Sequence, residues 1–142
     1  MSYSSCIAIA IPAETMPQLV KLAENDDVRA ALCRATIKKG RAFDYRGDHY
    51  PAYIEAYYII WDYVNYWHTS AGYKEIDQFI NDLENYKFIR IGEVTEDIVY
   101  ETIGEIEFPG LELDRFINTD NIGDSPLILF TDICKENKEE NA

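Results

Sequence analysis

The run from Tyr53 to Trp67 constrains the fold most, because it is long, contains no glycine or proline, and is dense in aromatic and β-branched side chains. This composition favours a strand. A helix stays open as an alternative, because residues 53, 57, 60, 64 and 67 would share one helical face. One face of a sheet cannot bury so many aromatic rings, so we expect some of them, including Trp61 and Trp67, to be exposed as interface anchors. The alternative is that the whole run belongs to the core.

The chain on either side of this run alternates between strand and helix signals. The spacing of Ile76, Phe79 and Ile80 is the clearest helical pattern in the sequence. The expected elements are a strand over 5–11, helices over 15–24 and 25–40, a hairpin of 41–45 with 53–67, a helix over 73–86, and strands over 87–93, 97–108, 111–117 and 127–133.

This order predicts the fold class α+β, with a ferredoxin-like βαββαβ sheet that carries its helices on one face. Two to three C-terminal antiparallel strands would extend the sheet or form a second layer. The length of 142 residues suits one domain. We place this domain at 1–134 and expect an acidic, disordered tail over 135–142. Such folds serve many unrelated functions.

The charge is unevenly distributed. Residues 1–71 contain 7 Lys and Arg against 8 Asp and Glu, whereas residues 72–142 contain 6 against 18, and the formal net charge is -13. This excess argues against direct binding to nucleic acid or to an anionic membrane. No apolar run is long enough to span a membrane, and the first residues lack the character of a secretory signal.

The three cysteines are widely separated and show neither a disulfide framework nor a metal-binding spacing. We therefore expect reduced thiols that are packed in the core, and a cytoplasmic location.

Four carboxylates are expected on one face of the strand over 97–108, together with Val99 and Ile103; they belong to Asp97, Glu101, Glu105 and Glu107. The other face is expected to be core and carries Ile98, Tyr100, Thr102, Ile106 and Phe108. Glu105 and Glu107 would stand roughly 7 Å apart, similar to phosphates along a nucleic-acid strand. Glu75 and Asp82, on the outer face of the 73–86 helix, would extend this acidic surface. The alternative is that these charges only confer solubility and keep sheet edges from pairing.

The sequence contains no catalytic pattern that we can identify. His49 and His68 lie in no triad or metal-ligand spacing, and no glycine-rich phosphate loop occurs. The segment 118–124 lacks the ligands of a calcium loop. We therefore expect no enzyme activity, no metal and no cofactor.

The function predicted from these features is that of a small acidic interaction module. It would inhibit a basic, nucleic-acid-binding partner as a nucleic-acid mimic, a profile shared by phage-encoded anti-defence and anti-CRISPR proteins and by immunity proteins. The partner-binding residues would be Asp97, Glu101, Glu105, Glu107, Glu75, Asp82, Trp61 and Trp67.

The alternative is a small-molecule sensor with an aromatic-lined pocket, in which Arg34, Lys38, Lys39 or Arg41 would hold an anionic ligand. The sequence also leaves a homo-oligomer open.

Overall fold

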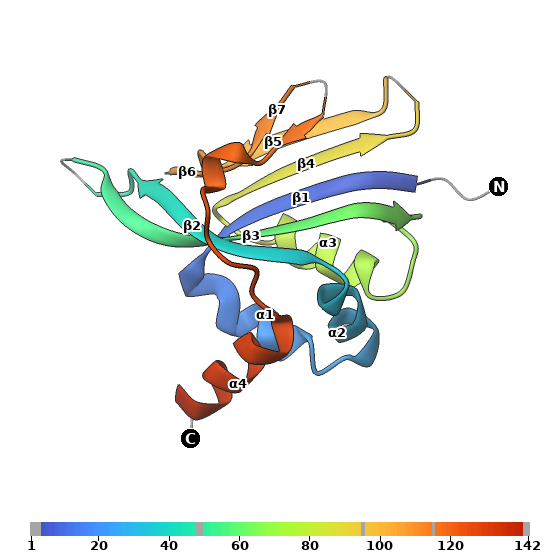
Figure 1. Cartoon of the computed structure of the whole chain (residues 1–142), viewed down its shortest axis with the longest axis horizontal. Coiled ribbons are helices and arrows are strands. Elements are labelled where there is room, and N and C mark those ends of the chain that lie inside the picture. The colour runs from blue at the N-terminus through green and yellow to red at the C-terminus, as the bar shows by residue number, and fades with distance from the viewer. Residues whose placement is uncertain (1–3, 48–49, 95, 115, 141–142) are drawn as a thin grey trace.

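The computed structural model describes residues 4–47, 50–94, 96–114 and 116–140 and shows a mixed α+β architecture (Figure 1). Its centre is a large antiparallel sheet with the strand order β5–β4–β1–β3–β2–β6, and a second, two-stranded sheet pairs β7 with β8. The strands are β1 (Ser4–Pro12), β2 (Thr36–Asp44), β3 (Ala52–Asn65), β4 (Tyr86–Gly92), β5 (Ile98–Ile103), β6 (Ile106–Glu107), β7 (Glu112–Leu113) and β8 (Ile117–Asn118).

Strand β1 lies in the middle of the sheet, as its apolar sequence predicts. It pairs with β3 on one side and with β4 on the other. Ile7, Ile9 and Ile11 pack on the face that the helices cover, whereas Ala8 and Ala10 pack on the opposite face. All five side chains are fully buried. The alternation of large and small residues therefore leaves a shallow second face that other side chains can fill.

The run from Tyr53 to Trp67 is a strand through Asn65, so the helical alternative is excluded. It forms the predicted hairpin with β2, and the register pairs Phe43 with Tyr53 and Thr36 with Ile60. β-branched and aromatic side chains suit this position because both faces of β3 are covered along its middle part.

Three helices, α1 (Met16–Leu22), α2 (Asp26–Cys33) and α3 (Tyr73–Asn81), pack on one face of the sheet (Figure 1). Asn25 begins α2, because its Oδ1 accepts hydrogen bonds from the N–H groups of Asp27 and Val28. Val28, Leu32 and Ile76 turn from these helices into the core.

The helix expected over 25–40 is corrected, because it ends at Cys33 and residues from Thr36 onward belong to β2. Pairing with β3 along nine residues outweighs the weak helical pattern of this segment. Lys38 and Lys39 are therefore strand residues and do not lie at the end of a helix. The helix expected over 73–86 is confirmed for Tyr73–Asn81, where the apolar spacing is clearest.

The C-terminal expectations are also corrected. In place of a strand over 127–133, a single bridge joins Ile128 to Ile37, and α4 (Phe130–Glu140) follows. Phe130 and Ile133 are buried against the helical layer. Their spacing of three residues suits a helix, and the segment expected as a disordered tail from 135 is helical through Glu140. Residues 141–142 lie outside the described part of the chain.

The strand expected over 97–108 is two strands at opposite edges of the sheet. β5 pairs with β4 and β6 pairs with β2, and only Gly104 and Glu105 lie between them. Gly104 has a φ of 93°, a conformation that favours glycine. The N–H of Tyr45 donates to the Glu105 carbonyl (2.9 Å), and the N–H of Glu105 donates to Asn85 Oδ1 (2.8 Å). The sheet therefore curls until its two edges approach at this end.

The segment after β6 fills the second face of the sheet. Phe108, Leu111 and Ile122 are buried there beside Tyr58. The strand expected over 111–117 is reduced to the short β7 and β8, followed by the 3-10 turn η2 (Asp120–Ile122). Lys87, only 8% exposed, donates from Nζ to the carbonyl of Leu111 (2.6 Å). This bond ties the segment to β4.

Among the helices in the described residues, none combines the length and apolar character needed to cross a membrane.

Candidate functional site

The most unusual surface of the molecule is built from residues 91–114, which contain eight carboxylates and no Lys or Arg. These residues form β5, β6, β7 and the turns between them. We call β5 together with the exposed carboxylates around it the acidic edge; these carboxylates belong to Glu93, Glu96, Glu105, Glu112 and Asp114.

The two basic side chains of β4 do not neutralise this surface as a whole. Arg90, on β4, forms an ion pair with Asp97 (2.8 Å). Lys87 is buried on the second face, where its Nζ lies 5.2 Å from the centre of the Tyr100 ring. The carboxylates of the acidic edge therefore keep most of their negative charge at the surface.

The four carboxylates predicted for one strand face are divided by the break at Gly104. Asp97 and Glu101 lie near β4, where the Tyr86 hydroxyl donates to Glu101 (3.0 Å). Glu107 lies on β6 at the other edge and accepts a hydrogen bond from the Tyr45 hydroxyl (3.3 Å). Glu105 is exposed between the two strands. The structure thus keeps Asp97 and Glu101 beside β4, each with its own partner, and separates them from Glu105 and Glu107.

The two predicted residues of α3 play different parts. The carboxylate of Glu75 accepts the N–H of Gly72 (2.6 Å) and so caps the helix. Asp82 follows the last turn of α3 and is exposed. Sequence reasoning missed Asp77, whose Oδ1 accepts the indole N–H of Trp67 (2.8 Å). No local pattern could have revealed this contact, because it joins α3 to the end of β3.

Trp61 and Trp67 cannot act as exposed anchors, because each is only 2% exposed. The indole N–H of Trp61 donates to the carbonyl of Ala31 (2.8 Å), so both indoles are core residues with satisfied donors. Their rings lie 5.5 Å apart. The prediction of tryptophan anchors is corrected, because the helices cover the face from which both rings project.

Exposed apolar side chains occur at several places on the surface, among them Tyr53, Phe116 and Leu127, and three of them lie on β5. Ile98 is 45% exposed, Tyr100 48% and Ile103 43%. The sequence predicts Ile98 and Tyr100 in the core, whereas only Ile106 and Phe108 of that set are buried. The chain after β6 covers the second face of the sheet near β6 but not at β5. This explains why Ile106 and Phe108 are buried whereas Ile98 and Tyr100 are exposed.

The backbone of β5 is also open on one side. The N–H of Gly92 donates to the Asp97 carbonyl (2.8 Å), so residues 97, 99, 101 and 103 direct their backbone groups toward β4. The N–H and C=O groups of Tyr100 and Thr102 consequently point away from the sheet. Within the described residues, β5 has no strand neighbour on that side.

Of the four cationic side chains proposed to hold an anionic ligand, two line the same groove. Lys39 and Arg41 line a groove of about 930 Å³ beside β2, together with Phe43 and Tyr53. Lys39 forms an ion pair with Glu55 (3.2 Å), and Arg41 lies 5.9 Å from the Tyr53 ring centre.

The other two cations lie outside this groove. Lys38 lines a hollow of about 550 Å³ with Ile60 and Phe116. Arg34 lines neither of these two spaces.

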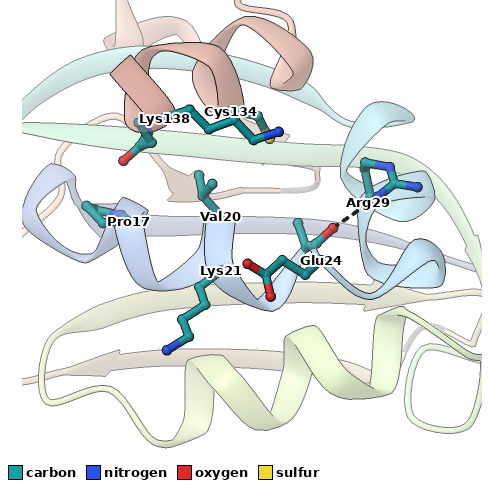
Figure 2. A pocket seen from close by; sticks show the side chains of 9 residues that line it. Pro17, Val20, Lys21, Glu24, Arg29, Cys134 and Lys138 are labelled. Atoms are coloured by element: carbon teal, nitrogen blue, oxygen red, sulfur yellow. Dashed lines mark hydrogen bonds between the residues drawn. The ribbon is translucent and has the colours of Figure 1, made fainter. Parts of the chain in front are cut away.

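A further pocket of about 470 Å³ lies between α1, α2 and α4 (Figure 2). Its wall mixes the charges of Lys21, Glu24, Arg29 and Lys138 around Cys134. Burial raises the pKa of the Cys134 thiol, with a smaller contribution from Cys33. A thiol held protonated is a poor nucleophile, so the pocket offers no activated group.

No cluster of three or more His, Cys, Asp or Glu residues in the described ranges is placed to hold a metal ion. No family model, curated protein or solved structure matches the chain. The functional argument therefore depends on the geometry alone.

Proposed function

We propose that this protein is a small acidic interaction module that inhibits a basic, nucleic-acid-binding partner. The observation that carries the proposal is the acidic edge, whose exposed carboxylates form no ion pair with any Lys or Arg that the structure describes and surround exposed apolar side chains of β5. Carboxylates would steer the partner's cationic surface into place, and Tyr100 with Ile98 would supply contact area. Occupation of that cationic surface would exclude nucleic acid.

This combination favours binding over mere solubility. A surface that serves only solubility needs charge but no exposed apolar row, and an edge strand with such a row is a liability unless a partner covers it. The class of protein that fits is a nucleic-acid mimic of the anti-defence, anti-CRISPR-like or immunity-like kind, and catalysis forms no part of the proposal. The described cysteines are free thiols, but Cys6 and Cys33 are exposed and Cys134 is half-buried, so the prediction of core thiols is wrong. Free thiols suit a reducing compartment, and the proposal therefore includes a cytoplasmic setting.

The finer description of the fold as ferredoxin-like also belongs to this proposal. It is supported by the antiparallel order β4–β1–β3–β2, with helices between β1 and β2 and between β3 and β4. β5 would then be an added edge strand beside β4, which is the position that the proposed docking requires.

The test begins with capture of proteins from a lysate at low salt and elution by rising salt. The eluted protein is then assayed for nucleic-acid binding with and without the wild-type chain. A double variant, Glu96→Lys with Glu105→Lys, should lose the inhibition, because both carboxylates belong to the acidic edge. The matched control, Glu24→Lys with Glu136→Lys, changes the net charge equally at two exposed residues of the helical layer and should still inhibit. Equal inhibition by both double variants, or capture indifferent to salt, would contradict the proposal.

A second candidate function is a sensor of small anions, favoured by the groove that joins Lys39 and Arg41 to two aromatic rings. Inorganic phosphate and nucleoside monophosphates should then raise the melting temperature of the wild-type chain but not that of Arg41→Met. An unchanged melting temperature with all of these probes would remove this candidate.

A further inference from the structure

We propose that β5 recruits its partner by strand addition, in which an extended cationic segment pairs with the open side of β5. This inference rests on the proposed function and specifies how the partner binds the acidic edge. Three separate features of β5 support it: its open backbone groups, its exposed side chains, and the charges on both sides of it.

The backbone supplies the first feature. Tyr100 and Thr102 direct their N–H and C=O groups away from β4, as the register of the β4–β5 pair requires. An incoming strand would satisfy these groups with the same hydrogen bonds that join β4 to β5. β5 spans six residues, Ile98–Ile103, which is a usual length for a strand in a sheet.

The side chains supply the second feature. Ile98 and Tyr100 project on the second face of the sheet and are about half exposed. A depression of about 410 Å³ lies beside Tyr100 and is lined by Tyr100, Glu112 and Leu113. Apolar side chains on one face of an incoming strand could therefore pack against Tyr100 and Leu113.

The charges identify the occupant. Glu112 lies at the depression on one face of β5, and Glu101 lies on the other face. A strand added here would have a carboxylate near each of its faces, so lysine or arginine residues would be favoured on it. A second copy of this chain fits poorly, because pairing two β5 strands would bring two such sets of carboxylates together in a chain of net charge -13.

A capped peptide of alternating lysine and valine is the probe for this interaction, and its control replaces lysine by glutamate. Bound to the full chain, the lysine peptide should slow the amide hydrogen exchange of Tyr100 and Thr102 selectively. The glutamate peptide should not. This measurement uses the wild-type protein and does not depend on any variant folding.

The decisive variant is Thr102→Pro, because the N–H that proline removes points away from β4 and makes no bond in the sheet. We expect it to weaken binding of the lysine peptide about tenfold, the loss that corresponds to one hydrogen bond. Thr102→Val retains the N–H and should bind like the wild type. Near-ultraviolet circular dichroism checks that both variants are folded.

The outcomes separate the two levels of proposal. If Thr102→Pro binds as tightly as the wild type while Glu101→Gln with Glu112→Gln weakens binding, acidic docking stands and strand addition is overturned. If neither set of variants affects binding, both proposals fail. If sedimentation shows a wild-type dimer that Thr102→Pro dissolves, the occupant is a second copy and the cationic strand is wrong.

Discussion

Tyr58 shows how a single buried side chain fixes the second face of the sheet. Its hydroxyl donates to the carbonyl of Arg41 (2.7 Å) and accepts the N–H of Gly110 (3.2 Å). A Cβ at Gly110 would lie 2.5 Å from this ring, and a Cβ at Gly40 would lie 2.7 Å from it. Both glycines are therefore required by close approach to Tyr58.

Burial raises the pKa of Tyr58 to about 12, and burial followed by the Glu101 carboxylate raises the pKa of Tyr86 to about 12. Unfolded tyrosines ionise near their ordinary value of 10.0, so between pH 10 and 12 the folded state binds more protons than the unfolded state. We therefore expect the free energy of unfolding to fall as pH rises through this interval. Urea unfolding at several pH values measures the slope.

Tyr86→Phe should make this slope shallower, whereas Tyr63→Phe, at a side chain that is 63% exposed, should leave it unchanged. An identical slope in the wild type and in Tyr86→Phe would show that the Tyr86 hydroxyl does not contribute to the effect.

At the level of residues, the sequence predicted the alternation of faces along 97–108 and the face that would be core, but not how far along the strand that face would be covered. Ile106 and Phe108 are buried, as expected, whereas Tyr100 has the same parity and is half exposed. The burial of Trp61 depends on α2, since its indole N–H reaches Ala31, thirty residues earlier in the chain. Contacts at that separation leave no trace in local periodicity.

Among the elements, those with strong local periodicity were predicted and those fixed by distant pairing were not. β1 and α3 follow their apolar spacing. β2 was assigned in part to a helix because its strand character comes from pairing with β3. α4 was missed because its apolar signal is weak: among the α4 side chains whose burial is described, only Phe130 and Ile133 are buried, and most of the others are polar.

The role of α4 can be tested with Ile133→Ala. Ile133 is 1% exposed, so its truncation should lower the free energy of unfolding by about 2–4 kcal/mol. Glu136→Ala changes an exposed residue of the same helix and should alter it by less than about 0.5 kcal/mol. Urea unfolding measures both. A similar, small effect of the two substitutions would mean that α4 is not docked on the helical layer.

For the molecule as a whole, strand order separates charge. β2 carries Lys38, Lys39 and Arg41, and β5 lies four strand spacings away, about 19 Å along the curved sheet. β5 and the basic strand β2 are thus separated along the sheet, although β6 returns Glu107 to the side of β2. An approaching cationic partner would be oriented by this asymmetry before contact.

The same asymmetry predicts how salt acts on stability. Repulsion within the acidic edge is screened by salt, so Glu96→Gln should raise the free energy of unfolding by about 0.3 kcal/mol at low ionic strength and by less at high ionic strength. Glu14→Gln should lower it, because Glu14 forms an ion pair with Arg46 (2.8 Å). Thermal unfolding at two ionic strengths compares the variants. Stabilisation by Glu96→Gln that is independent of salt would contradict an electrostatic cause.

Gly104 and Glu105, the two residues between β5 and β6, form a short link between the two edges of the curled sheet. Because this link has almost no slack, a displacement of β5 that pulled it away from β4 would also pull on the bonds that hold β6 to β2. A force that separates β5 from β4 is therefore also borne by the β6–β2 pair, and the two edges of the sheet resist separation together.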